Sequence, residues 1–463
     1  MHPSLRMGAV AALFVAGAAP PSRLAAQASD RAVPATYAIT NARIVPGSGP
    51  AIEHGTVVVR NGLIAAVGAN VSAPADARVV DGTGLTVYPG LVDAYSSLGI
   101  PAPAANAGGG RGGAAFAAAS AEPQGQPTAD HPQGITPEVQ AVDLMKVDAS
   151  TFDGPRSAGI TTTLTAPASG YLKGSAVLVD LTDQDLADGV VKAPAAMTMA
   201  FSRGRGFGGG RGGYPGSLMG IFAAFRQEIL DAQRYGTWKA MYAKNPRGIE
   251  RPPMDPGLEA LQPLLAGDIP IVFEANSARE ISRAIDLAKE FKLKAIIAGG
   301  EEADQCIPQL KSAGIPVLLS LDFPKRAATD TAPQLLATLE ERVNAPKVAG
   351  RLAAAGIPFA FSSGGITNWS DFLGNAGKAV ADGLNGDAAV KALTLGAAQI
   401  LGVDQQLGSI EVGKIANLTV TKGELFDEGV KVETVFIDGR QITPETETTT
   451  AGRGGRGGRG GQL

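Results

Sequence analysis

The chain has 463 residues, and 44% of them are hydrophobic, so it is long enough for one large domain and a small one. Its 40 basic and 44 acidic residues give a formal net charge of -4 at pH 7. This balance argues against a protein that attracts nucleic acids or anionic membranes through its overall charge. Cys306 is the only cysteine, which excludes an intramolecular disulfide. Its place in "EEADQCIPQL" predicts the buried face of a helix rather than a catalytic thiol.

Residues 1–28 have the pattern of a secretory signal peptide. Arg6 precedes an apolar run from Met7 to Ala19, and Ala26-Gln27-Ala28 forms an A-x-A cleavage sequence. A membrane anchor is disfavoured because a helix of this apolar length does not span the roughly 30 Å hydrocarbon layer. We therefore expect an exported protein, periplasmic or extracellular, with no membrane span after cleavage.

Residues 36–88 and 401–445 alternate short β-rich runs with turns. Asn61-Gly62, Asp81-Gly82 and Asp438-Gly439 are dipeptides typical of β-hairpins. Because both ends of the chain share this pattern, we predict that they form the two parts of one small β-sandwich domain.

Residues 89–400 alternate strand-like and helical runs. The strand-like runs are "GITTTLTAP", "PAAMTMAF", "IPIVFEA", "LKAIIAGG", "IPVLLSL" and "IPFAFSS". A helix is predicted from Ala278 to Phe291, with Ile281, Ile285 and Leu287 to Ala288 on one face. Buried strands alternating with amphipathic helices predict an α/β fold, specifically a (β/α)8 TIM-like barrel.

Glycine and arginine dominate two inserts in the barrel, near residues 105–130 and 202–217, and the tail at 446–463. Such segments bury too little apolar surface to offset the entropy lost on ordering, so we expect mobile loops and a disordered tail. Arginine-glycine tracts also occur in proteins that bind RNA, with salt-sensitive affinity. Export and the slightly acidic composition argue against that role here, so we expect no nucleic-acid partner.

Several stretches together resemble the imidazolonepropionase-like branch of the amidohydrolase superfamily. They are "ITNARIVPGSG", "YPGLVDA", "AGITTTLTAP", "LEALQPLLAGDIPIVFEA" and, most specifically, "ALTLGAAQILGVDQQLGSIEVGKIANLTV". The resemblance spans roughly residues 36–443. It implies the barrel with its small β-domain, and a chemistry in which divalent ions, zinc in typical relatives, activate water to cleave C-N bonds.

The resemblance also implies where the metal ligands of such relatives fall in this chain. The positions of the His-x-His pair, of the histidines after strands five and six, and of the aspartate after strand eight are Tyr95, Ser97, Glu274, Gly299 and Gly364. Asn276 stands where many relatives carry a further histidine. The bridging lysine falls on Asp180 or on a residue of "AAMTMAF", none of which is lysine. The aligned ligands are therefore substituted, and no metal or other cofactor is expected.

The histidine count supports the same conclusion without an alignment. The sequence has three histidines, and His2 leaves with the signal peptide. His54 lies in "IEHGT", predicted to be a turn, and His131 in the loop "ADHPQG", and both are interpreted as surface residues. A catalytic zinc site commonly draws three protein ligands, most of them histidine, which these two distant residues do not supply.

Carboxylates near the barrel mouth offer another chemistry. They are Asp93, Glu274, Glu301, Glu302 and Asp322. They would suit a hard ion such as magnesium or calcium, or act as a general acid-base pair, for which Asp93 and Glu274 are the candidates. The structural interpretation is favoured: Asp93 packs beneath the rim, and Glu301 and Glu302 cap the following helix.

Serines at the same strand ends suggest a nucleophile. They are Ser96, Ser97, Ser362 and Ser363. With no histidine base nearby in sequence and no G-x-S-x-G motif, the interpretation that they fill the volume vacated by the ligands is preferred.

The sequence thus leaves three hypotheses. The first is an exported amidohydrolase-type pseudoenzyme that binds a small molecule, or that associates with an intact amidohydrolase paralogue or with itself. The second is a hydrolase that cleaves C-N bonds of a cyclic amide or dipeptide with an atypical acidic site. The third is nucleic-acid binding through the arginine-glycine tracts.

Overall fold

The computed structural model describes residues 35–101, 131–148, 150–201, 214–326 and 333–444. The predicted signal peptide, the insert near 105–130, most of the insert at 202–217, and the tail lie outside these residues. Within the described ranges, no helix combines the length and hydrophobicity needed to cross a membrane.

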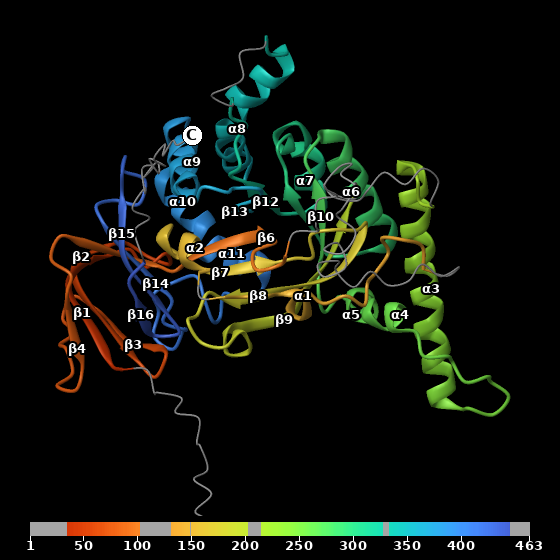
Figure 1. The fold of residues 1–463 in the computed structure, drawn as a ribbon, viewed down its shortest axis with the longest axis horizontal. Helices are drawn as coiled ribbons and strands as arrows, with labels where there is room; N and C mark the ends of the chain where they lie inside the picture. The colour runs from red at the N-terminus through yellow and green to blue at the C-terminus, as the bar shows by residue number, and fades with distance from the viewer. Residues whose placement is uncertain (1–34, 102–130, 149, 202–213, 327–332, 445–463) are drawn as a thin grey trace, which may run out of the picture. The chain divides into compact units, whose positions relative to one another are not determined.

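Strands from both ends of the described chain join one eight-stranded sheet (Figure 1). They are β1 (Tyr37–Ile44), β2 (Ile52–Arg60), β3 (Leu63–Gly68), β4 (Arg78–Asp81), β5 (Leu85–Pro89), β14 (Leu418–Lys422), β15 (Lys431–Ile437) and β16 (Arg440–Ile442). Their order is β16-β15-β14-β5-β1-β2-β3, with β4 paired to β1. The antiparallel pairing of β5 with β14 joins the two ends of the chain. All eight strands are hydrogen-bonded into one sheet, so the two-layered sandwich stays a prediction.

Two of the predicted hairpins form, and one does not. Asn61-Gly62 and Asp438-Gly439 have φ angles of 53° and 80°, and of 51° and 73°, as a type I′ turn requires. The hairpin at Asp81-Gly82 is wrong, because β4 and β5 both run parallel to β1 instead of pairing with each other. The Asp81 carboxylate accepts hydrogen bonds from the backbone N–H and the hydroxyl of Thr83, which bends the chain without reversing it.

The second sheet has eight strands and nearly closes into a barrel. They are β6 (Leu91–Ser96), β7 (Ile160–Thr165), β8 (Leu172–Asp180), β9 (Val190–Ala200), β10 (Ile271–Ala275), β11 (Ala295–Gly299), β12 (Val317–Ser320) and β13 (Phe359–Ser362). The chain is therefore a mixed α/β protein, as predicted. The sheet departs from an all-parallel (β/α)8 barrel at β8, which runs antiparallel to both β7 and β9.

Helices follow or precede the barrel strands in chain order. They are α1 (Ala141–Leu144), α2 (Asp153–Ser157), α3 (Leu218–Lys244), α4 (Pro256–Ala260), α5 (Gln262–Ala266), α6 (Ala278–Phe291), α7 (Ile307–Ala313), α8 (Leu336–Ala355), α9 (Ser370–Ala381), α10 (Gly386–Leu393) and α11 (Leu395–Leu401). Helix α6 has the predicted bounds and buries the predicted face. Ser277 and Glu280 form a capping box at its start, which fixes where it begins. Cys306 is buried, as expected, at the end of a 3-10 turn that leads into α7.

Asp93 links the first and last strands of the barrel sheet. Its side chain is fully buried in β6. It accepts hydrogen bonds of 2.7 Å from both the backbone N–H and the hydroxyl of Ser363, directly after β13, and one of 3.3 Å from Thr163 in β7. Burial raises the pKa of the Asp93 carboxyl to about 6. Asp93 therefore holds the barrel together, as the structural interpretation of its role expected.

His131 is not the ordinary surface residue that the sequence predicted. Its ring lies between Asp255, the N-cap of α4, and Glu228 in α3, with Nε2 3.0 Å and Nδ1 3.1 Å from their carboxylate oxygens. The Glu228 side chain is only 3% exposed. Sequence reasoning missed this junction of His131 with Glu228 and Asp255, because the three residues are far apart in the chain. His54, by contrast, is exposed, but it lies in strand β2 rather than in a turn.

This junction makes the stability of the fold depend on pH. Burial raises the pKa of Glu228 to about 7, despite the attraction of His131. Burial lowers the pKa of His131, but Asp255, Glu228 and Glu138 outweigh it and leave that pKa above its usual value. Both groups thus hold protons more tightly in the folded chain than in the unfolded one. Their contribution to stability is complete below the unfolded pKa values and is lost as the pH rises through the folded ones.

We therefore expect the free energy of unfolding to fall by about 1–3 kcal/mol between about pH 5 and pH 8. The decline should be shallower in Glu228→Gln, which removes one of the two groups. Urea denaturation across this pH range checks it, with Asp286→Asn, an exposed carboxylate on α6, as the control. Parallel pH profiles for the unmodified protein and Glu228→Gln would contradict this account.

Candidate functional site

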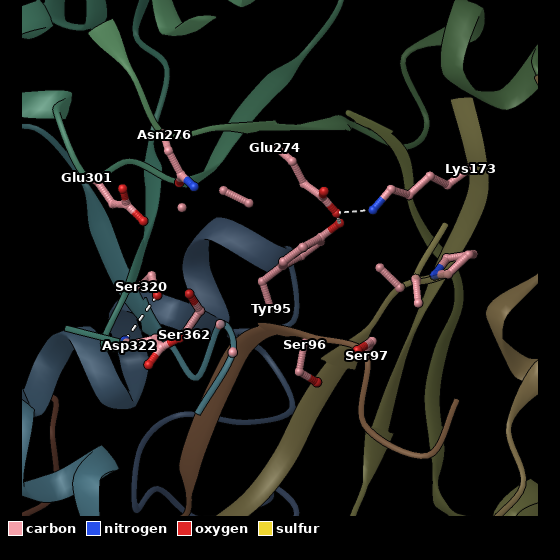
Figure 2. A pocket seen from close by; sticks show the side chains of 17 residues that line it. Tyr95, Ser96, Ser97, Lys173, Glu274, Asn276, Glu301, Ser320, Asp322 and Ser362 are labelled. Carbon is pink, nitrogen blue, oxygen red and sulfur yellow. Dashed lines mark hydrogen bonds and ion pairs between the residues drawn. The ribbon is translucent and has the colours of Figure 1, made fainter. Parts of the chain in front are cut away.

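A cavity of about 340 Å³ opens where the parallel barrel strands end. Its walls come from the ends of β6, β10, β11, β12 and β13 and from the start of β8 (Figure 2). The residues that line it are Tyr95, Ser96, Ser97, Ala166, Pro167, Ala168, Lys173, Glu274, Asn276, Ala298, Gly299, Glu301, Ser320, Asp322, Ser362, Gly364 and Gly365. Catalytic and binding residues of barrel proteins belong at this end of the sheet.

The structure brings the predicted ligand positions together around this cavity. Tyr95, Ser97, Glu274, Gly299 and Gly364 all line it, and Asn276 lies among them. Asp93 is not part of the lining, because its carboxylate points to Ser363. The predicted acid-base pair of Asp93 and Glu274 is therefore split between the barrel interior and the cavity.

A buried lysine meets Glu274 in the cavity. The Lys173 ammonium donates a 2.5 Å hydrogen bond to Glu274 Oε1, and the Tyr95 hydroxyl donates a 2.6 Å hydrogen bond to the same oxygen. The Lys173 side chain is 4% exposed and that of Glu274 is 32% exposed. Burial, followed by the negative charge of Glu274, raises the pKa of Tyr95 well above its usual range, so the phenol stays a neutral donor. The charge of Glu274 is thus neutralised within the protein (Figure 2).

Sequence reasoning missed Lys173 because of the direction of β8. The functional residues of a parallel barrel are sought where its strands end. Since β8 runs antiparallel, its first residues, and not its last, reach the cavity. A signal was present in "LKGSAVLVD": the whole strand is buried, and a lysine in such a run is rare unless it is paired.

The segments considered for the bridging lysine do not reach the cavity. Asp180 pairs with Thr162 near the start of β7, at the opposite end of the sheet from Lys173. It accepts hydrogen bonds from Thr162 and from Asn417, which precedes β14. These bonds link the barrel to the sheet that contains β14. The residues of "AAMTMAF" lie in β9 and directly after it, and they do not line the cavity either.

Two of the predicted ligand positions have backbone conformations that favour glycine. Gly299 and Gly364 have φ angles of 96° and 61°, in the region that side chains disfavour. A Cβ atom at Gly299 would collide with the Asn276 amide oxygen, and one at Gly364 with the Ser320 hydroxyl. A larger residue at either position requires its neighbours to move.

These residues do not fit the zinc of typical relatives. Within residues 35–444, the described positions hold no group of three or more histidine, cysteine, aspartate or glutamate side chains that could bind a metal ion. Glu274 is the one carboxylate among the predicted ligand positions, and it already accepts a charged hydrogen bond from Lys173. A divalent ion beside it would also be repelled by that ammonium group.

The carboxylates after β11 and β12 have roles other than those predicted. Glu302 accepts a 2.7 Å hydrogen bond from the backbone N–H of Ala278, so it caps α6, the helix before it and not the one after it. Glu301 and Asp322 line the cavity instead. Burial, and then neighbouring carboxylates, raise the pKa of Glu301, and burial raises that of Asp322.

The serines at the strand ends have no histidine to activate them among the described residues that line the cavity. Ser363 donates to Asp93, and Ser96 shares a 2.9 Å hydrogen bond with Thr163. Neither His54 nor His131 lines the cavity. A serine nucleophile therefore lacks its partner.

Comparison with known proteins agrees with the fold described above. Residues 339–442 match the Amidohydrolase family. The amidohydrolase tasK of Hapsidospora irregularis is 24% identical over 421 residues, which cover 85% of this chain and 40% of that protein. The chain thus spans about 40% of the length of this curated relative.

Solved structures extend the similarity over the described fold. An amidohydrolase from Thermotoga maritima MSB8 is 26% identical, with a TM-score of 0.72 over 88% of this chain and 100% of that one. A prolidase complexed with N-methylphosphonate-L-proline is 16% identical, with a TM-score of 0.55 over 89% of this chain and 100% of that one, and this match concerns the fold alone. The family match at residues 339–442 and the shared architecture together show that the chain is similar to amidohydrolases.

Proposed function

We propose that this protein is an exported amidohydrolase-fold protein without the family's metal centre, which binds a small molecule in its barrel cavity. The observation that carries the proposal is the hydrogen-bonded ion pair of Lys173 with Glu274, joined by Tyr95. In this arrangement a protein ammonium group supplies the positive charge that a metal ion would otherwise bring to the carboxylate.

The energetics favour this arrangement over a bound ion. Lys173 is nearly fully buried, and a charged group in that position is stable only when it is paired. Moving it away to admit a metal would leave a buried ammonium group without its partner. The absence of histidine from the cavity lining removes the usual zinc ligands as well.

The cavity itself supports a binding role. Its volume of about 340 Å³ lies within the range of small-molecule sites, and its walls offer hydroxyl, amide and carboxylate groups. The same proposal includes association with an intact amidohydrolase paralogue, or self-association. In such a complex, the bound ligand would be passed to the partner or sensed by it.

A second candidate is a hydrolase that acts on the C-N bond of a cyclic amide or dipeptide. It is favoured by one observation: Glu274 and the neutral phenol of Tyr95 are adjacent in the cavity, as a base and an acid would be. Asp93 takes no part in this version, because it is buried outside the cavity.

Metal content and turnover separate the two candidates. Protein purified without chelators, from medium supplemented with zinc, should contain less than about 0.1 equivalent of transition metal by mass spectrometry. It should release no amine from a panel of dipeptides and cyclic amides. Hydrolysis that Glu274→Gln abolishes, and that the surface control Glu259→Gln preserves, would favour the second candidate. A full equivalent of zinc with chelator-sensitive hydrolysis would refute the first.

The ion pair should also be measurable as stability. Lys173→Met should lower the free energy of unfolding by about 1–3 kcal/mol, discounted because Glu274 is partly exposed. Lys173→Met combined with Glu274→Gln should cost less than the sum of the two single changes, since the double variant leaves no charge unpaired. Urea denaturation of all four proteins gives the coupling energy.

The exposed pair of Lys239 and Glu259 provides the matched control. Lys239→Met should change the free energy of unfolding by less than about 1 kcal/mol. A Lys173 effect no larger than the Lys239 effect would mean that the buried pair does not organise the cavity.

A further inference from the structure

We propose that the cavity recognises the ammonium group of a compact organic ligand, which is held by the carboxylates of Glu301 and Asp322 and the hydroxyl of Ser362. This inference rests on the proposed binding function and names its ligand class. It concerns the side of the cavity away from Lys173, where Glu301, Asp322 and Ser362 lie (Figure 2).

The two sides of the cavity differ in charge. On one side, the negative charge of Glu274 is balanced by Lys173. On the other side, burial and the nearby negative charges of Glu341 and Asp322 raise the pKa of Glu301. Glu341 and Glu302 add to the negative field there, while Lys325, the cation that acts on Asp322, is ion-paired with Asp371. A ligand that enters the cavity therefore contacts one side whose charges cancel, at Glu274 and Lys173, and one side with net negative charge, at Glu301 and Asp322.

The carboxylates of Glu301 and Asp322 have no hydrogen-bond or ion-pair partner among the described residues. The bond between Ser320 and Asp322 uses the backbone N–H of Asp322 and leaves its carboxylate uncommitted. Both residues remain exposed to solvent, and the partial burial that the fold imposes still raises the pKa of both carboxyls. A cation in the cavity would replace the lost solvation.

Ser362 is an independent indication of a ligand. The residue is only 1% exposed, and it is part of the cavity lining. Its hydroxyl has no partner in the described part of the chain, in contrast to the next residue, Ser363, whose hydroxyl donates to Asp93. A buried hydroxyl is normally hydrogen-bonded, so one left open toward a cavity indicates a group that arrives with the ligand.

An ammonium group matches these acceptors in number and in charge. A primary ammonium offers three N–H donors and no acceptor, and the site offers two carboxylates and a hydroxyl. A divalent metal fits less well, since the described residues here do not form a metal-binding group. The cavity of about 340 Å³ limits the ligand to a compact molecule.

The test is a saturation-transfer NMR titration of the full-length protein with n-butylammonium chloride, n-butanol and sodium butyrate at constant ionic strength. We expect n-butylammonium to bind at least about tenfold more tightly than n-butanol, which has the same chain but no charge, and than butyrate. Equal affinity for n-butanol, or tighter binding of butyrate, would overturn the inference without any variant being needed.

Variants then locate the site. Glu301→Gln and Asp322→Asn should each weaken n-butylammonium binding by about tenfold, and Ser362→Ala by about threefold. Asp286→Asn, an exposed carboxylate on α6, is the matched control and should leave the affinity unchanged. Unchanged affinity in folded Glu301→Gln and Asp322→Asn, verified by their melting temperatures, would also refute the proposal.

The metal measurement keeps the two proposals apart. Failure of n-butylammonium to bind a protein that is free of zinc refutes ammonium recognition and leaves the metal-free fold in place. A stoichiometric zinc content refutes the proposed function itself.

Discussion

The interior of the cavity depends on one interaction, the hydrogen-bonded ion pair of Lys173 with Glu274. A carboxylate at the end of a barrel strand, in a partly desolvated site, needs a positive charge close by. Here the chain provides that charge itself, and Tyr95 adds a neutral donor to the same oxygen. The negative charge of Glu274 is thus balanced by groups of the protein itself.

Much of the fold was predictable because its signals are local. The bounds of α6, the glycine turns at residues 62 and 439, and the strand ends that carry Tyr95, Glu274 and Gly364 follow from periodicity, turn chemistry and family resemblance. The misses that affect the cavity and the buried charges are long-range. The direction of β8 depends on its pairing with β7 and β9, so the arrival of Lys173 in the cavity was not visible from its neighbours in sequence. The junction of His131 with Glu228 and Asp255 was hidden for the same reason.

The backbone favours glycine at two of the predicted ligand positions. The conformations of Gly299 and Gly364, with Asn276 and Ser320 packed against them, leave no room for a side chain. Restoring a histidine or an aspartate at either position would require φ to change and a neighbour to move. The main-chain conformation at these two positions is therefore as unsuited to a metal-binding side chain as glycine itself.

Barrel closure also has a kinetic consequence. Strands β7, β8 and β9 pair in sequence order through short connections, so they can form early. The bonds from Ser363 to Asp93 join residues 270 positions apart and bring together the two ends of the sheet. Because a long loop must be closed before such contacts stabilise the chain, we infer that the contact between Ser363 and Asp93 forms late in folding and breaks first in unfolding. A substitution at Asp93 that slowed refolding more than it accelerated unfolding would contradict that order of events.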